Sequence, residues 1–210
     1  MTRNVPAQHK PFPELAEPLP NPSPYSIIDT TGKTWLPTNG MTSLIERKLL
    51  VPLVAGAQSV ARHELGHVKW SPPELPEVDY DLRYLMAVED ARVNLGLLRV
   101  GIPVLLSDEE RAQVAFLARA DLAERDVLAF LLRAIAAQGT NAERAMLGEL
   151  GGESEAVRDL AYRRVRRVRI ELLRAARARG SDVAGFEVTL SLAEELAREL
   201  EPELARLGLP

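Results

Sequence analysis

The sequence contains no cysteine, few aromatic residues and no long apolar run. Without cysteine the chain has no disulfide bonds, thiolate zinc sites or cysteine nucleophiles, so histidine and carboxylate side chains have to bind any metal. Aromatic residues make up 5% of the 210 residues, which points away from a β-sandwich. No apolar run reaches the roughly 18–20 residues of a membrane span, and no signal-peptide pattern opens the chain. We therefore expect a soluble, cytoplasmic protein with no membrane partner.

Positive charge is not in excess either. The formal net charge is −4, so no overall basic field indicates a nucleic-acid partner. Hydrophobic residues make up 46% of the chain, which is enough for a substantial core. Histidine is scarce, with His9, His63 and His67 as the three residues of this type.

Proline and turn residues divide the chain. Seven prolines lie in residues 1–24, and because proline fits neither a helix interior nor a central strand, they predict an extended arm. Residues 25–37, YSIIDTTGKTWLP, have two short β-prone runs around Thr-Thr-Gly-Lys and predict a β-hairpin. The remainder of the chain has the pattern of helices.

Caps and breakers predict where these helices begin and end. Ser43-x-x-Glu46 predicts a short helix from about residue 44. The next helices are expected from about Pro52 to Lys69 and from about Asp81 to Arg99. Later helices are expected at 107–139 with a break near Asp121, at 141–150, from Ser154 to Gly180, and from Ser191-x-x-Glu194 onward with a kink at Pro202. We place the domain boundary near residues 101–107, which divides the chain into an arm (1–24), a core (25–104) and a helical C-terminal region (105–210).

The stretch SVARHELGHVKW, residues 59–70, fits the H-E-x-x-H pattern of zinc-dependent peptidases. Residues i and i+4 share one face of a helix, so His63 and His67 can bind one ion. Glu64 is rotated away from that face, where a carboxylate can hold a water molecule and accept its proton. The alternative is a pair of surface histidines on an amphipathic helix.

A catalytic zinc site also needs a third protein ligand, and His9 lies in the arm. In the next predicted helix one apolar stripe contains a carboxylate; the stripe consists of Leu82, Met86, Glu89, Val93 and Leu97. Glu89 thus projects where a core residue is expected, and a buried, unpaired carboxylate is unfavourable without a cation. A metal ion would supply the cation. The alternatives are an ion pair with Arg92 or Arg62, or a stripe that ends at Glu89.

Asp90 lies on a different face of the same predicted helix, beside Asn94 one turn later. Its carboxylate could accept the second ring N–H of a ligating histidine and so fix the tautomer. Asp90 could also be the metal ligand in place of Glu89. Arg92 could orient either acid.

These residues resemble a known family of enzymes. HELGHVKW followed by VEDARVN resembles the gluzincin zinc metallopeptidases, and more specifically the metallopeptidase-like domains that accompany von Willebrand factor A modules in some bacterial proteins. The resemblance covers about residues 41–100 and implies zinc on His63, His67 and Glu89, with Glu64 as general base. The chain departs from the thermolysin-type spacing because position 93 is Val, and its C-terminal half lacks the alternating strands and helices of a von Willebrand A module.

The expected fold class is mainly α, with a zincin-like helical core, a small β-hairpin and a C-terminal helical bundle. The expected function is that of a zinc metallopeptidase that hydrolyses a peptide or protein substrate by metal-activated water. The alternative is a non-catalytic, zinc-braced helical scaffold. No histidine follows the motif to stabilise an oxyanion, and the remaining candidates for that role are Tyr80, Tyr84 and Arg83.

Residues 162–180 carry eight arginines against one acid. Such a helix could bind the phosphates of a nucleic acid. It could also be a solvated helix whose arginines pair with acids of the last predicted helix, which we favour because charged helix faces usually face solvent. The proline-rich arm is a disordered tail, a ligand for a partner, or an inhibitory segment in which His9, Glu14 or Glu17 reaches the metal.

Overall fold

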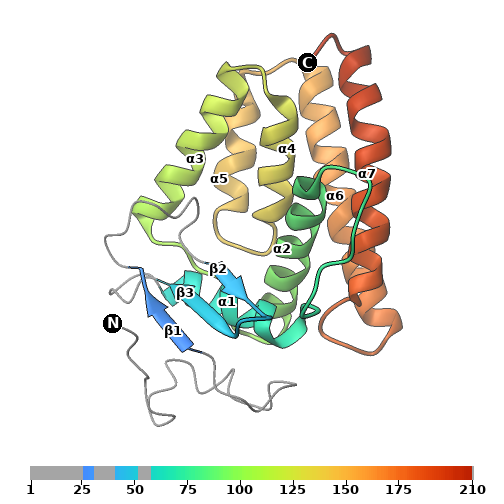
Figure 1. The fold of residues 1–210 in the computed structure, drawn as a ribbon. Helices are drawn as coiled ribbons and strands as arrows, with labels where there is room; N and C mark the ends of the chain where they lie inside the picture. The colour runs from blue at the N-terminus through green and yellow to red at the C-terminus, as the bar shows by residue number, and fades with distance from the viewer. Residues whose placement is uncertain (1–25, 31–40, 52–57, 210) are drawn as a thin grey trace. The chain divides into compact units, whose positions relative to one another are not determined.

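A computed structural model describes residues 26–30, 41–51 and 58–209 (Figure 1). Helices dominate these residues, which confirms the mainly α class. They divide into two compact units, with the first ending at Pro76 and the second beginning at Glu77, not near residues 101–107. The division falls at the Ser-Pro-Pro-Glu-Leu-Pro-Glu stretch, where prolines prevent the preceding helix from continuing. The proline-rich arm and most of the predicted 25–37 hairpin lie outside the described residues.

The first unit contains a three-stranded sheet and one helix within its described residues. The strands are β1 (Ser26–Asp29), β2 (Met41–Ser43) and β3 (Lys48–Val51), in the order β1-β3-β2. Helix α1 (Gln58–Trp70) contacts β2 and β3. In the central strand, three consecutive side chains are buried, namely Leu49, Leu50 and Val51. Burial of neighbouring residues, which point to opposite faces, indicates that both faces of β3 are covered.

The hairpin that the structure describes in the first unit joins β2 to β3. β1 pairs with β3 in parallel, and the antiparallel partner of β3 is β2, with Ser43 opposite Lys48. The helix predicted from about residue 44 was wrong, because residues 44–47 form the turn between β2 and β3. The Ser43 hydroxyl accepts the N–H of Glu46 at 3.2 Å, as a helix cap would, but Arg47 adopts a φ of 52° and the chain reverses. Serine side chains stabilise turns and helix starts by the same local hydrogen bond.

The second unit is a bundle of helices. Its elements are α2 (Leu82–Arg99), α3 (Asp108–Ala123), α4 (Val127–Ala136), α5 (Glu143–Gly148), the 3-10 helix η2 (Glu149–Gly152), α6 (Glu155–Ala178) and α7 (Phe186–Arg206). Helices α2, α4, α6 and α7 all contact one another and enclose one apolar core (Figure 1). Among the described residues, no helix combines the length and the apolar character that a membrane crossing requires.

Side-chain caps begin several of these helices at the predicted places. Asp81 accepts the N–H of Arg83, Ser154 accepts that of Val157, and Ser107 forms a complete capping box with its N3 residue. The predicted start of the last helix at Ser191 was wrong, because α7 begins at Phe186. Buried residues at helical spacing already begin before Ser191, so packing against the core extends the helix past that cap signal; they are Thr189, Leu192, Leu196 and Leu200.

Gly139, just after α4, packs directly against the backbone of α2. Its φ is +79°, and a Cβ atom there would lie 2.9 Å from the carbonyl carbon of Asn94 and 2.9 Å from the nitrogen of Leu95. Gly101 has nearly the same φ, +80°, with nothing within 4 Å of an added Cβ. Gly139 is therefore required by both its conformation and its close contact, whereas Gly101 is required by its conformation alone.

We expect Gly139→Ala to lower the free energy of unfolding by about 3 kcal/mol, because strain and a backbone clash add. Gly101→Ala should cost about 1 kcal/mol, since it introduces only a left-handed alanine. Urea denaturation followed by circular dichroism measures both values. Equal losses for the two variants would show that the close contact between Gly139 and α2 is not needed.

Candidate metal centre

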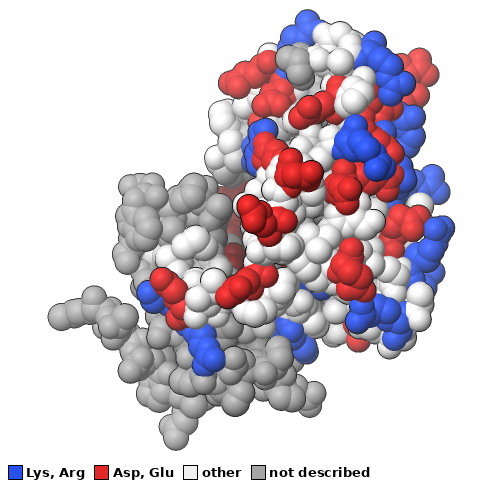
Figure 2. Space-filling view, turned by 45° about the vertical axis from the view of Figure 1, so that its right-hand side comes forward, with Lys and Arg blue, Asp and Glu red and all other residues white. Residues whose placement is uncertain are grey.

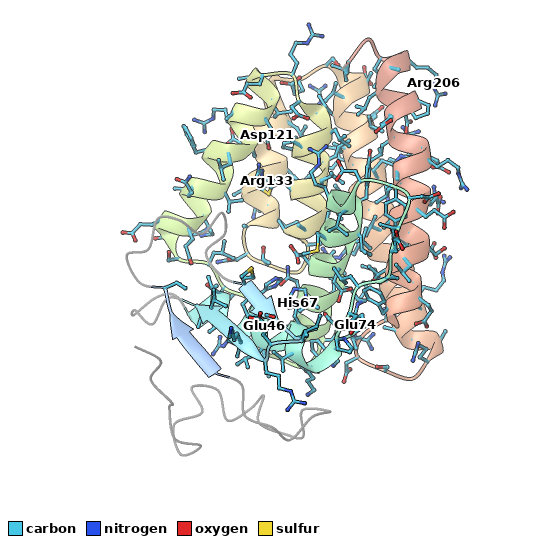
Figure 3. All side chains as sticks on the ribbon, in the orientation of Figure 1. Glu46, His67, Glu74, Asp121, Arg133 and Arg206 are labelled. Carbon is cyan, nitrogen blue, oxygen red and sulfur yellow. The ribbon has the colours of Figure 1, made fainter. Side chains whose placement is uncertain are left out.

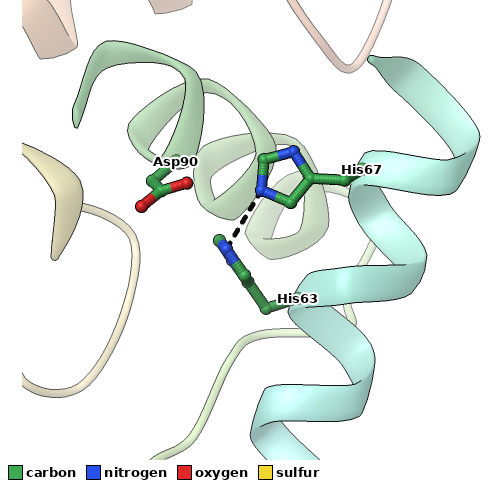
Figure 4. A group of neighbouring side chains, drawn as sticks. All are labelled: His63, His67 and Asp90. Carbon is green, nitrogen blue, oxygen red and sulfur yellow. Dashed lines mark hydrogen bonds between the residues drawn. The ribbon is translucent and has the colours of Figure 1, made fainter. Parts of the chain in front are cut away.

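His63 and His67 lie one turn apart on α1 and face each other. Their Nε2 atoms are 3.1 Å apart, and the rings meet edge to face with centroids 4.6 Å apart (Figure 4). Both side chains are half-buried. The i,i+4 spacing on a helix produces this pairing, as the sequence predicts.

The separation of the two nitrogens fits a shared metal ion. Zinc–nitrogen bonds of about 2.0–2.1 Å at a tetrahedral angle hold two ligand nitrogens about 3.3–3.4 Å apart. The observed 3.1 Å also fits a hydrogen bond, in which one Nε2 carries a proton and the other accepts it. A metal ion would replace that proton and take the lone pairs of both rings. The donor set and its spacing are therefore those of a metal-binding histidine pair.

Ser71 orients one of the two rings. Its hydroxyl oxygen lies 2.9 Å from Nδ1 of His67. A metal-binding histidine usually donates its second ring N–H to an acceptor, which leaves the first nitrogen unprotonated for the metal. Ser71 can accept that N–H from His67. It follows His67 by one helical turn, just past the end of α1, so the i,i+4 spacing could have identified it from the sequence, although it was not identified.

Thr42 of β2 holds the glutamate of the motif. Its hydroxyl lies 2.6 Å from Oε2 of Glu64, to which it donates, and 3.1 Å from the Glu64 carbonyl oxygen. Glu64 is 7% exposed, so this hydrogen bond serves a buried carboxylate. With Oε2 bound to Thr42, Oε1 is the oxygen available to take up a proton. Thr42 was not identified from the sequence, because its contact depends on how β2 packs against α1.

Glu89, the predicted third ligand, forms an ion pair within the second unit. Arg92 donates from Nη2 to Oε1 at 2.5 Å and from Nε to Oε2 at 2.7 Å, while Thr189 donates to Oε2 at 3.2 Å. Glu89 and Arg92 are each 2% exposed. The predicted burial of Glu89 is confirmed. The ion pair with Arg92, which the sequence offered as an alternative to a metal, supplies a cation, and Glu89 as a metal ligand stays a prediction.

The apolar stripe predicted for α2 does not match the burial of this helix, because the helix is covered on almost every side. Two residues of the stripe, Leu82 and Met86, are 46% and 42% exposed. Tyr84 and Leu85 lie off the stripe and are 1% and 0% exposed. A helix that is covered all round has no single apolar face, so periodicity cannot show where its polar residues point.

Asp90, one position after Glu89, is the half-buried carboxylate of α2. Figure 4 draws Asp90 with the two histidines, and a set of two imidazoles and one carboxylate could hold a metal ion. The histidines belong to the first unit and Asp90 to the second. Asp90 was considered from the sequence as the ligand in place of Glu89, and it has the donor chemistry for that role.

The other residues predicted to support a metal ligand have structural contacts in the bundle. Arg92 also donates from Nη1 to the carbonyl oxygen of Ala184 at 2.9 Å. Asn94 donates from Nδ2 to the carbonyl oxygen of Ala136, also at 2.9 Å. These bonds tie α2 to α4 and to the segment before α7.

The three candidates for stabilising an oxyanion are placed in different surroundings. The hydroxyl groups of Tyr80 and Tyr84 are buried and have no hydrogen-bond partner among the described residues. Burial raises the pKa of Tyr84 to about 12 and also raises the pKa of Tyr80. Arg83 is exposed and donates from Nε to Asp81 at 2.8 Å. A role of Tyr80, Tyr84 or Arg83 as oxyanion donor stays a prediction.

The arginine-rich helix α6 forms ion pairs with its neighbours, as favoured from the sequence. Arg164 pairs with Glu199 at 2.6 Å and with Glu203 of α7, and Arg169 pairs with Glu143 of α5 at 2.8 Å. The hydrogen bond from Arg164 lowers the pKa of Glu199. A similar pair joins Arg133 of α4 to Asp121 of α3 at 2.9 Å (Figure 3). Much of the positive charge of α6 is therefore neutralised within the second unit.

Comparisons with protein-family models, curated proteins and solved structures find no match for the chain. The candidate metal centre is accordingly described from the geometry and chemistry of its own residues.

The hydrogen bond from Thr42 gives a prediction about the first unit. Thr42→Val removes the hydroxyl that donates to the buried Glu64 carboxylate. We therefore expect the free energy of opening of the α1 amides to fall by about 1–3 kcal/mol. Thr42→Ser keeps the hydroxyl and should cost only a few tenths of a kcal/mol. Hydrogen exchange of the α1 amides measures the two values. Similar losses in both variants would show that the hydroxyl does not hold Glu64.

Proposed function

We propose that this chain is a zinc metallopeptidase of the cytoplasm, which hydrolyses peptide bonds in a peptide or protein substrate. The observation that carries the proposal is the facing pair of Nε2 atoms, 3.1 Å apart, on the helix that also carries Glu64. Two residues of the motif are oriented by hydrogen bonds to neighbouring side chains. Glu64 is bonded to Thr42, and His67 is bonded to Ser71. Such preorganised groups are a feature of catalytic metal sites.

In this proposal His63, His67 and Asp90 bind the zinc ion. The bundle uses both carboxylate oxygens of Glu89 in the ion pair with Arg92, and Asp90, on another face of α2, is the alternative carboxylate. The chain has no cysteine, so imidazole and carboxylate groups are the donors that suit zinc here. Three protein ligands leave the fourth position of a tetrahedral zinc ion for water or substrate, which is the arrangement of catalytic sites.

A bound zinc ion would polarise the scissile carbonyl group and lower the pKa of a water molecule. Glu64 then acts as general base through Oε1, takes up the proton of the attacking water and delivers it to the leaving amine. Thr42 holds the other carboxylate oxygen, so Glu64 keeps one orientation through both proton transfers. Ser71 accepts the Nδ1 proton of His67, which keeps the Nε2 lone pair available for the metal.

A non-catalytic scaffold braced by zinc is the second candidate. It is favoured by the burial of Glu64, which is 7% exposed and bonded to β2 as a structural carboxylate would be. The two candidates differ at the fourth ligand position of the metal, which is open to water in an enzyme and closed in a structural site.

Metal analysis distinguishes the possible third ligands. We expect purified protein to bind one zinc ion per chain, and His63→Ala and Asp90→Ala to lose it, because each removes a ligand. Glu89→Gln should keep the metal but destabilise the second unit by about 3 kcal/mol, since it leaves the Arg92 charge buried without its partner. Plasma mass spectrometry and thermal unfolding give the two quantities. Retention of zinc in Asp90→Ala and its loss in a folded Glu89→Gln would return the ligand role to Glu89.

Substitution of the proposed general base separates the enzyme from the scaffold. Glu64→Gln should reduce hydrolysis of a quenched fluorescent peptide library by at least about 100-fold, because the amide cannot take up the proton. Its zinc content should stay that of the wild type, which serves as the internal control. A zinc-loaded wild type without activity on the library, or an unchanged rate in Glu64→Gln, would contradict the proposed mechanism.

A further inference from the structure

Tyr162 of α6 is an exposed aromatic residue that borders two hollows in the surface of the second unit. The side chain is 49% exposed. One hollow is an open groove of about 910 Å³ between α6 and the end of α7. The other, of about 520 Å³, lies between α6 and the segment around α5, and Tyr162 is the residue that lines both.

Three arginines around Tyr162 differ from the paired arginines of α6. Arg166 in the groove and Arg144 in the smaller hollow are exposed and form no ion pair with any described residue. Arg206, at the end of α7 (Figure 3), donates to the carbonyl oxygen of Pro202 at 3.2 Å and has no carboxylate partner among the described residues. Their positive charges are therefore not neutralised locally.

The charge of this surface is opposite in sign to that of the chain. Six arginines and four carboxylates line the two hollows, whereas the chain has a net charge of −4. A local positive excess attracts an acidic partner.

Apolar side chains lie between these charges. Ile170 and Leu207 line the groove and are 40% and 37% exposed, and Leu147 lines the smaller hollow. Tyrosine and arginine are the residue types that, with tryptophan, contribute most to binding energy at protein interfaces. An exposed tyrosine beside apolar side chains and arginines without an ion pair to a described residue thus has the composition of a protein-binding surface.

We propose that the Tyr162 surface, defined as Tyr162, Arg144, Arg166, Arg206, Ile170 and Leu207, binds an acidic peptide segment of a partner protein. Carboxylates of the segment pair with Arg144, Arg166 and Arg206, and its apolar side chains pack beside Tyr162 in the two hollows. This inference goes beyond the proposed function, because none of these residues belongs to the candidate metal centre.

A peptide fits this surface better than a nucleic acid. Duplex DNA carries a charge about every 1.7 Å along its axis, and its phosphates would meet carboxylates as well as arginines here. Asp159 and Glu171 lie in the groove itself. Figure 2 shows acidic and basic side chains together on the face that it draws. The mixed charges that line the groove suit a peptide with spaced carboxylates.

Fluorescence anisotropy of a short labelled peptide of alternating glutamate and leucine tests the proposal on the full chain. We expect the wild type to bind it, and Tyr162→Ala and the double variant Arg144→Ala/Arg166→Ala each to weaken binding by about tenfold or more. Arg177→Ala is the matched control, because this exposed arginine is on the same helix and lines neither hollow. The control should bind like the wild type, and circular dichroism shows whether each variant is folded.

Four outcomes would overturn the proposal. The first is that the wild type does not bind the peptide, and the second is that the control and the two test variants lose affinity equally. The third is that a single-stranded DNA oligonucleotide binds more tightly than the peptide. The fourth is a concentration-dependent dimer that Tyr162→Ala abolishes. The third outcome would assign the surface to nucleic acid and the fourth to a second copy of the chain. Activity of the metal centre does not enter the readout, so failure here leaves the proposed peptidase untouched.

Discussion

Arg92 and Glu89 form a charged pair in the interior of the second unit, where each side chain is 2% exposed. Neither charge can be buried alone, because an unpaired ion in this environment costs several kcal/mol, so each requires the other. Thr189 of α7 and the carbonyl oxygen of Ala184 complete the pair and tie it to the last helix. The pair uses both carboxylate oxygens of Glu89, and Asp90 is the other carboxylate of α2.

The polar residues of the first unit follow a similar rule at the H-E-x-x-H helix. Glu64 is buried and has the Thr42 hydroxyl as a donor, while His67 has Ser71 on the ring nitrogen that does not face His63. These bonds orient both side chains within the first unit in the absence of a metal ion. The same arrangement would serve a hydrolase or a braced scaffold, and Glu64 is the residue whose role separates the two.

Local patterns in the sequence predicted much of this structure. Helix spacing predicts the facing of His63 and His67, and cap residues predict the starts of α2, α3 and α6. Interactions between distant residues were missed. Thr42 meets Glu64 across 22 positions, and no local pattern reports how a strand packs on a helix. Periodicity identifies one apolar face, and α2 is covered on almost all faces, so the pattern did not choose between a metal ion and Arg92 as the cation for Glu89. Ser43 shows the same limit, since one hydrogen bond can begin a helix or close a hairpin turn.

The central claim is that the histidine pair of α1 binds a metal ion as part of a site completed by a carboxylate. Anomalous diffraction from zinc-soaked crystals, recorded on both sides of the zinc absorption edge, tests it most directly. We predict a zinc peak about 2.0–2.1 Å from Nε2 of both His63 and His67 and at a similar distance from a carboxylate oxygen of Asp90. Absence of a peak at the histidines, with the two rings still hydrogen-bonded to each other, would contradict the claim.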